Sequence, residues 1–294
     1  LKSVEAKVYP DQIHAVPKKR RLFYRHGFRV SVFPQREVRK VLDEFRPDVV
    51  HVQVSDPIGL SVVSYARKHG IPVVTTEHNQ PEVLTESLKM PRALKKGANA
   101  MLAAYFRNRQ SKSDFVTMPT KQAIRNLIGK GEEFAVPVAA VSNGVNLSAF
   151  KPGRASKEVY DKYGISAQKL TVLYVGRVDP EKKVGLVVKA FLQAGVPNTQ
   201  LVVVGDGVEK SKLEASAKKF ADVHFLGRIL PPDLYDLYKV GNVFATASEI
   251  ETQGIVLIEA AASGLSLIAV DKGAVSEICV DGENGILCKA GDVE

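Results

Sequence analysis

Hydrophobic positions in the first half of the chain alternate between short continuous runs and helical spacings. The continuous runs predict buried strands at 47–54, 71–78, 114–120 and 136–145. The helical spacings predict helices at 58–70, 92–113 and 121–131. In the longest of these helices, Leu94, Ala98, Met101 and Tyr105 fall on one stripe. The first half is therefore expected to alternate strand and helix.

The second half repeats this alternation over a longer stretch. Strands are predicted at 170–176, 200–207, 223–227, 242–248, 265–270 and 285–288, and helices at about 184–194, 209–220, 231–240, 254–263 and 273–280. Short strands rich in Val, Ile and Leu and separated by helices are typical of parallel sheets covered on both faces. Right-handed crossovers then produce doubly wound domains. We predict an α/β protein with two Rossmann-like domains.

The two series of elements are separated by the segment SNGVNLSAFKPG at 142–153. Asn-Gly, Pro-Gly and the polar residues around them are typical of a turn and linker. We place the domains at 1–142 and 143–294, with the nucleotide-binding domain second. The sequence starts without Met in weakly patterned residues and stops at Gly-Asp-Val-Glu, so we expect each domain to lack its outer end.

Charge is distributed unevenly between the predicted domains. Residues 1–142 hold 24 Lys and Arg against 13 Asp and Glu, and residues 143–294 hold 17 against 19. The charges of +11 and −2 favour an anionic surface, such as a membrane face or nucleic acid, as a partner of the first domain. A basic surface that only keeps the protein solvated is the alternative. The cations gather at 18–21 and at Arg92, Lys95, Lys96, Arg107, Arg109 and Lys112.

The chain shows no sign of a membrane span or of secretion. No apolar run reaches the roughly 20 residues that cross a bilayer, and the first residues lack the pattern of a signal peptide. Cys279 and Cys288 form no Cys-x2-Cys pair. We interpret them as reduced thiols of a cytoplasmic protein, with a disulfide between them as the alternative.

The stretch Gly-Arg-Val-Asp-Pro-Glu-Lys-Lys at 176–183 follows a predicted strand and precedes a helix. Ligands of doubly wound sheets bind at the carboxyl ends of strands. Arg177 and Lys182, five residues apart on this loop, can both face an anion such as a diphosphate. A charged surface turn is the alternative interpretation.

A second polar stretch, Glu-Thr-Gln-Gly at 251–254, joins another strand to a helix. Gly254 allows a ligand to approach the backbone, and the free N–H groups of the helix start can hold a phosphate or a sugar hydroxyl. Glu251 lies in the loop, and Glu259, about two turns into the helix, can accept both ribose hydroxyls. Pairing of Glu259 within the fold is the alternative.

A third candidate, His78, ends the strand and turn Thr-Thr-Glu-His-Asn at 75–79. Its place beside polar residues at a strand end predicts contact with a sugar in a cleft between the domains, although a lone His is more often structural. Three other signals are absent from the sequence. It contains no Asp-x-Asp, no Gly-x-Gly-x-x-Gly and no Gly-x-x-x-x-Gly-Lys-Ser/Thr, which disfavours a metal-bridged diphosphate, a dinucleotide fingerprint and a P-loop. Gly205-Asp206-Gly207 is interpreted as a tight turn.

The ordered set of these stretches resembles glycosyltransferase family 4. The resemblance rests on PDVVHVQVSDPIGLSVVSYARKHGIPVVTTEHN, VSNGVNLSAFKP, VLYVGRVDPEKKVGLVVKAF, LVVVGDG, VHFLGRI and SEIETQGIVLIEAAASGLSLIA, which follow one another in the family's order. It implies a GT-B fold and a retaining, metal-independent transfer of a hexose from a nucleotide sugar. UDP-hexose is the favoured donor, with no further cofactor, no metal and no nucleic-acid partner.

The resemblance also implies roles for individual residues. Arg177 and Lys182 would grip the donor diphosphate after the turn at Gly176. Glu259 would bind the ribose, and His78 would contact the sugar near its reacting carbon. Glu251 would face the sugar and phosphate together with the backbone of Gln253, Gly254 and Ile255. The family's usual mechanism is front-face attack, with the acceptor hydroxyl deprotonated by the departing phosphate.

The chain departs from the family pattern in two places. The family's first strand and its Gly-rich loop are absent, which bears on the activity of the chain as printed. Thr252-Gln253 replaces the commoner Gly-Phe, which leaves the donor open. TTEHNQPEVL is similar to members that glycosylate membrane diacylglycerol, so a lipid or lipid-linked glycan acceptor on the inner face of the cell membrane is expected.

Other functions compete with this interpretation. A nicotinamide-dependent oxidoreductase would need a Gly-rich fingerprint and an acid about 20 residues further on, and neither is visible. A sugar-nucleotide epimerase or a phosphorylase shares the two-domain form. A nucleotide-sugar-binding module without activity is the remaining alternative.

Overall fold

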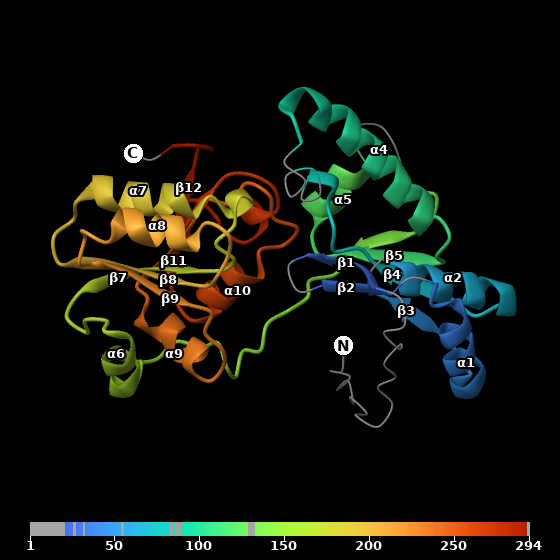
Figure 1. The fold of residues 1–294 in the computed structure, drawn as a ribbon, viewed down its shortest axis with the longest axis horizontal. Coiled ribbons are helices and arrows are strands. Elements are labelled where there is room, and N and C mark those ends of the chain that lie inside the picture. The colour runs from blue at the N-terminus through green and yellow to red at the C-terminus, as the bar shows by residue number, and fades with distance from the viewer. Residues whose placement is uncertain are drawn as a thin grey trace. The chain divides into compact units, whose positions relative to one another are not determined.

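A computed structural model describes residues 21–25, 28–31, 33–53, 56–82, 85, 90–128 and 133–292. The chain forms two compact units, both drawn in Figure 1. The first takes its described residues from 1–78, 104–117 and 132–139, and the second from 79–103, 118–131 and 140–294. Residues 18–20 of the cationic run lie outside the described residues.

The first unit is built around a parallel sheet whose strands follow the order β3-β4-β5-β6. These strands are β3 (Val50–Val52), β4 (Val73–Thr76), β5 (Phe115–Met118) and β6 (Val138–Ala140). The remaining elements are the antiparallel pair β1 (Arg21–Arg25) and β2 (Phe28–Ser31), and the helices α1 (Gln35–Phe45) and α2 (Pro57–His69). The predicted α/β class with parallel strands is confirmed here.

Helix α2 shows how local sequence sets an element of this unit. Asp56 caps its start by accepting a hydrogen bond from the backbone N–H of Gly59 at 2.7 Å, and Pro57 occupies the first turn. Such a cap stabilises a helix by about 1 kcal/mol. The helix ends where Gly70 takes the left-handed conformation. Its inner face packs Val63 and Ala66 against the valines of β3 and β4.

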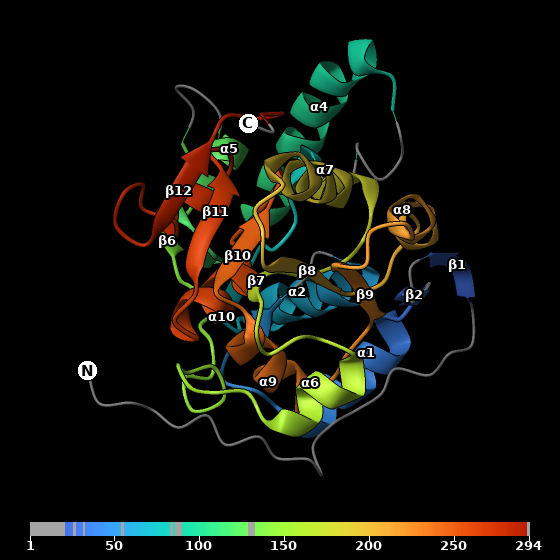
Figure 2. The same cartoon turned by 90° about the vertical axis from the view of Figure 1, so that its left-hand side faces the viewer.

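The second unit contains a six-stranded parallel sheet in the order β12-β11-β10-β7-β8-β9. The strands are β7 (Leu170–Val175), β8 (Thr199–Val204), β9 (Val223–Gly227), β10 (Val243–Thr246), β11 (Ser266–Val270) and β12 (Gly285–Cys288). Helices α7 (Val184–Ala194) and α8 (Lys210–Ala217) cover one face, and α6 (Lys157–Tyr163), α9 (Asp233–Val240) and α10 (Ile255–Ala262) cover the other (Figure 2). Both cysteines are free.

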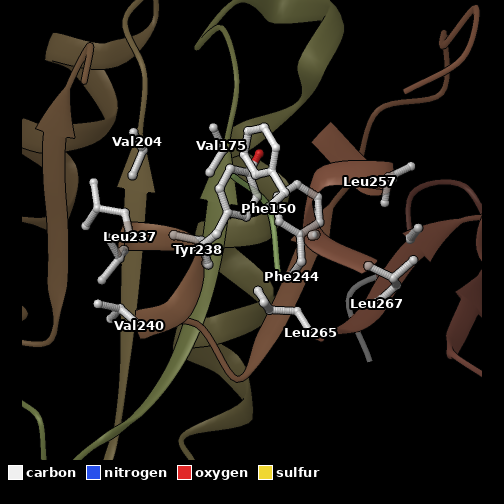
Figure 3. Close-up of a cluster of buried hydrophobic side chains, with 14 of the residues drawn as sticks. Phe150, Val175, Val204, Leu237, Tyr238, Val240, Phe244, Leu257, Leu265 and Leu267 are labelled. Carbon is white, nitrogen blue, oxygen red and sulfur yellow. The ribbon is translucent and has the colours of Figure 1, made fainter. Parts of the chain in front are cut away.

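Alternation along the strands divides the core of this unit into two clusters. Leu173 and Val175 of β7 face one cluster, and Tyr174 between them faces the other. Figure 3 shows the first cluster, in which the ring of Tyr238 lies beside Phe150 and Phe244. The Phe150 and Tyr238 rings meet edge to face with centroids 5.3 Å apart. This cluster fixes α9 on the sheet.

Several elements differ from the sequence predictions. The β1–β2 pair, α1 and α6 were not expected. Each of these two helices buries one apolar side chain, Val38 or Val159, so hydrophobic periodicity gives little signal. The helix predicted at 273–280 is a single 3-10 turn, Val275–Glu277, because Ile278 leaves helical geometry with φ −121°.

Two further helices, α4 (Arg92–Gln110) and α5 (Lys121–Ile128), flank β5 in the sequence. Within the described part of the chain, no helix combines the length and the apolar character that crossing a membrane requires. Residues 141–156 connect β6 to α6 without helix or strand.

Candidate functional site

The second sheet has a topological switch point between β7 and β10. The chain runs from β7 outward through β8 and β9 on one side, and from β10 outward through β11 and β12 on the other. Doubly wound proteins bind ligands at the carboxyl ends of the strands at such a point. The loop at 176–183 leaves β7 here, and the loop at 247–254 leaves β10.

Glycines allow the loops that leave β7 and β8 to touch. A Cβ on Gly205 would lie 1.7 Å from the carbonyl oxygen of Gly176, and one on Gly207 would lie 2.4 Å from that of Val178. Gly205 also has a φ of +141°. The Gly-Asp-Gly segment therefore does more than make the predicted tight turn, because it sets the path of the loop that carries Arg177.

Arg177 is held by two carboxylates of its own loop. Its guanidinium donates to Asp179 and forms an ion pair of 2.6 Å with Glu181. Burial disfavours the charged guanidinium, but these carboxylates outweigh that effect and raise its pKa. Asp179 in turn accepts from the backbone N–H of Val208 at 3.0 Å. The Arg177 guanidinium is therefore held in position before any ligand binds, while 52% of the Arg177 side chain stays exposed.

Lys182 and Glu251 join the two loops of the switch point. The Lys182 Nζ atom lies 2.6 Å from Glu251 Oε1, across 69 positions of sequence. The side chains are 19% and 13% exposed, so the pair is largely sheltered from water. Beside it, Lys183 pairs with Glu249, and Lys272 lies 3.7 Å from the same carboxylate. The hydrogen bond from Lys183 lowers the pKa of Glu249.

The segment before α10 is fixed by Gln253. This buried side chain accepts from Asn143 Nδ2 at 2.7 Å through Oε1 and donates to Ser142 Oγ at 2.5 Å through Nε2. Gly254 follows in the left-handed conformation with φ +79°, and α10 starts at Ile255. The N–H groups of a first helical turn have no partner within the helix, so this segment can offer them to an anion.

Glu259 lies on α10 and faces α9. Its Oε2 accepts the hydroxyl of Tyr238 at 2.5 Å. Burial raises the pKa of Glu259, and the Tyr238 hydrogen bond opposes that rise. Burial and the nearby carboxylate raise the pKa of Tyr238, which therefore remains a donor. The ring of Tyr238 belongs to the core, so the orientation of Glu259 depends on core packing.

His78 belongs to the first unit and lies just beyond β4. Its Nε2 is 2.9 Å from Oε1 of Gln53. The preceding residue, Glu77, is fully buried and accepts from Gln110 Nε2 at 3.0 Å. The turn that carries His78 is therefore tied to Gln53, just beyond β3, and to Gln110 at the end of α4.

The structure thus joins some of the predicted site residues directly and anchors the others through different partners. Lys182 meets Glu251, whereas Arg177, Gln253 and Glu259 bind residues that the sequence analysis did not single out. These partners are Ser142, Asn143, Asp179, Glu181 and Tyr238, and one further residue, Glu249, pairs with Lys183. Asn143 was interpreted only as part of a turn, and no sequence signal connects Tyr238 to Glu259. No group of His, Cys, Asp and Glu suited to a metal ion occurs among the described residues.

Comparison with known proteins identifies both halves of the chain. Residues 3–149 match the family model Glycosyltransferase Family 4, and residues 156–294 match Glycosyl transferases group 1. The chain is 31% identical over 274 residues to alpha-monoglucosyldiacylglycerol synthase of Acholeplasma laidlawii, covering 88% of the chain and 67% of that protein. It is 28% identical over 284 residues to the GDP-mannose-dependent alpha-mannosyltransferase of Mycobacterium tuberculosis, covering 96% of the chain and 70% of that protein.

A solved structure agrees with this assignment at the level of the fold. Anabaena Alr3699/HepE, in complex with UDP and glucose, superimposes with a TM-score of 0.68 at 21% identity, covering 87% of this chain and 68% of that one. The chain spans about half to about two thirds of the length of the curated relatives it matches. The ordered motifs, the two parallel sheets and these matches lead to one conclusion: the chain belongs to glycosyltransferase family 4 and has the GT-B fold.

Proposed function

We propose that the protein is a retaining, metal-independent glycosyltransferase that moves a hexose from a nucleotide-diphosphate sugar to an acceptor hydroxyl. The observation that carries the proposal is the pair of Lys182 and Glu251, which joins the two loops at the switch point of the second sheet. UDP is the favoured nucleotide, with support from the complex of HepE with UDP and glucose.

The cations of the β7 loop are suited to a departing diphosphate. Arg177 presents an oriented fork, and Lys182 has three N–H donors that a carboxylate and a phosphate can share. Both would stabilise the charge that builds on the leaving group as the glycosidic bond breaks. The departing phosphate oxygen would take the proton of the acceptor hydroxyl on the same face of the sugar, which retains the anomeric configuration.

The remaining site residues would bind the donor by its hydroxyl groups. Oε2 of Glu259 is engaged by Tyr238, which leaves Oε1 as an acceptor for the ribose hydroxyls. Oε2 of Glu251 would accept from the transferred sugar. The backbone N–H groups of Gln253, Gly254 and Ile255 would donate to the sugar or a phosphate, and His78 would contact the sugar beside its reacting carbon.

A membrane lipid, such as diacylglycerol, or a lipid-linked glycan is the proposed acceptor. The relative from Acholeplasma laidlawii is named for a diacylglycerol product. The charge of +11 on residues 1–142 supports attraction to the anionic inner face of the cell membrane. The protein would then work as a cytoplasmic, peripheral enzyme.

Transfer from labelled donors tests the proposal directly. The full-length protein is incubated with UDP-hexoses and GDP-hexoses and with vesicles that contain diacylglycerol, in the presence of EDTA. A lipid product with an α-linkage by NMR is expected from a UDP-hexose. A β-linked product, or transfer that EDTA abolishes, would contradict the retaining or the metal-independent mechanism. Nucleotide binding is measured in parallel, since a ligand at 100 times its dissociation constant stabilises by about 2.7 kcal/mol.

A further inference from the structure

Helix α4 carries three large apolar side chains on its outer face. Leu94 is 60% exposed, Met101 is 69% exposed and Tyr105 is 44% exposed. The opposite face is the buried one, because Ala103 and Phe106 are both less than 10% exposed. The stripe predicted from the sequence therefore points away from the protein, whereas the apolar stripe of a surface helix normally faces the core.

The exposed stripe is apolar from Leu94 to Tyr105, and the exposed Asn108 follows it on the same face. The small exposed residues Gly97, Ala100 and Ala104 lie between its large side chains, so that neighbours along the stripe are three to four residues apart. We call these six residues, Leu94, Gly97, Ala100, Met101, Ala104 and Tyr105, the apolar ridge. At a rise of about 1.5 Å per residue, the ridge is roughly 16 Å long.

The charges of α4 are of one sign. Its 19 residues include Arg92, Lys95, Lys96, Arg107 and Arg109 and no Asp or Glu. By their helical angles, Lys96 and Arg107 lie on one flank of the ridge and Lys95 and Arg109 on the other. An apolar strip between two rows of cations is typical of a helix that lies in the interface of an anionic membrane.

The carboxyl-terminal end of the ridge adjoins a basic cavity. The guanidinium of Arg109 lies 5.0 Å from the ring centroid of Tyr105. Arg109 also lines a cavity of about 450 Å³ together with Arg67 and Lys112. None of the described residues that line this cavity carries a carboxylate, and Ser64 and Thr75 add hydroxyl groups. Such a cavity suits the phosphate of a lipid headgroup next to the inserted ring.

We propose that α4 docks this protein on anionic membrane by inserting its apolar ridge below the headgroups, with a lipid phosphate in the Arg109 cavity. This inference deepens the proposed function, on whose membrane partner it rests, by naming the element that makes the contact. Charge complementarity favours the membrane over a second copy of the chain, because two copies of α4 would bring like charges together.

Vesicle binding by matched variants tests the inference. Sedimentation of the full-length protein with phosphatidylcholine vesicles containing 30% phosphatidylglycerol compares the wild type, Met101→Asp and Leu147→Asp. Leu147 is 68% exposed and lies outside α4, so its variant carries the same charge change at the same exposure. Partition is expected to fall at least about tenfold for Met101→Asp and less than twofold for Leu147→Asp. Arg109→Gln is expected to lose about fivefold on anionic vesicles and little on neutral ones.

A fluorescence measurement keeps the inference testable if an aspartate variant folds poorly. The printed sequence contains no Trp, so Met101→Trp and Leu147→Trp each add a reporter. Anionic vesicles should shift the emission of the first to the blue and leave that of the second unchanged. Equal vesicle binding by all variants, or unshifted Met101→Trp emission, would overturn the inference. So would a lipid-free dimer that Met101→Asp dissociates, because a second copy would then cover the ridge.

The same samples separate this inference from the proposed function. Stabilisation by UDP, read as a rise in melting temperature, should be equal in the wild type and Met101→Asp. Vesicle insertion without any UDP binding or transfer would leave docking by α4 standing and remove the proposed function. Transfer from a UDP-hexose that is unchanged in Met101→Asp, together with unchanged vesicle binding, would remove docking by α4 and leave the proposed function standing.

Discussion

At the carboxyl end of the first sheet, polar side chains meet through hydrogen bonds between hydroxyl, imidazole and amide groups. Thr76 Oγ1 lies 2.6 Å from Thr117 Oγ1 and 2.7 Å from His51 Nε2, and His78 meets Gln53. At the carboxyl end of the second sheet, the contact between loops is the ion pair of Lys182 and Glu251.

One architecture can therefore serve two kinds of ligand. A nucleotide diphosphate is charged, so a site for it needs cations that are held in place by carboxylates until the ligand shares them. A sugar or lipid hydroxyl is neutral, and hydrogen bonds such as those of Thr76, Thr117 and His78 suit it. Substitutions at the end of each sheet test this contrast.

The largest expected effect comes from the backbone contact beneath the charged end. Gly205→Ala would place its Cβ against the Gly176 carbonyl and is expected to destabilise the second unit by about 3 kcal/mol. Gly282→Ala is the matched control, because Gly282 has φ +76° but no atom near its added Cβ. Gly282→Ala should destabilise the protein by only about 1 kcal/mol, because only its left-handed backbone conformation is strained. If chemical denaturation gives equal losses of unfolding free energy for Gly205→Ala and Gly282→Ala, the contact between the loops is unimportant.

Removal of the ammonium of Lys182 should have the next largest effect. Lys182→Ala is expected to lower kcat/KM for the UDP-sugar about 100-fold, or about 2.7 kcal/mol, because it removes a cation from the leaving group. Lys189→Ala, an exposed lysine on the following helix, is the control and should retain activity. If the melting temperature of Lys182→Ala falls as steeply as its activity, the pair with Glu251 is structural.

At the carboxyl end of the first sheet, His78→Ala should have a smaller effect of a different kind. Loss of one hydrogen bond to the sugar is expected to lower kcat about tenfold. The dissociation constant of UDP should not change, because UDP lacks the transferred hexose that His78 would contact. The exposed His69, replaced by Ala, provides the comparison. A weakened UDP complex in His78→Ala would place His78 at the diphosphate and remove the contrast between the ends.

The smallest effect concerns pH and the buried carboxylate of Glu259. Its folded pKa lies above the ordinary value of 4.5 because of burial. The folded state therefore holds the proton more tightly, and the stability contributed by this group falls as pH rises from about 4.5 through the raised pKa. Glu259→Gln should melt up to about 2 °C higher than the wild type at pH 7.

Measurements at acid pH and of nucleotide binding test whether the buried charge of Glu259 causes this difference in stability. Below about pH 4.5 the wild type and Glu259→Gln are both neutral at position 259, so the difference between their melting temperatures should vanish. UDP binding by Glu259→Gln should weaken at pH 7 even though the protein is more stable. A variant that is less stable at pH 7 would mean that the charged carboxylate is needed by the fold.

Most of the architecture could be predicted because its signals are local. The strands of the second sheet lie within two or three residues of their predicted bounds. Runs of Val, Ile and Leu and the glycines that end them can be recognised from neighbouring residues alone. Elements with one buried side chain, such as α1 and α6, were missed because periodicity needs several apolar positions.

Local sequence specifies which polar residues follow the ends of strands, because turn chemistry and hydrophobic period depend on neighbours along the chain. The partners of these residues depend on the tertiary fold. Lys182 pairs with Glu251, 69 positions away, and Glu259 accepts a hydrogen bond from Tyr238 of another helix. The tertiary fold also decided which side of α4 is buried. A helical stripe specifies which residues share a face, but only packing against the rest of the chain selects the face that is covered, and here Leu94, Met101 and Tyr105 remain exposed.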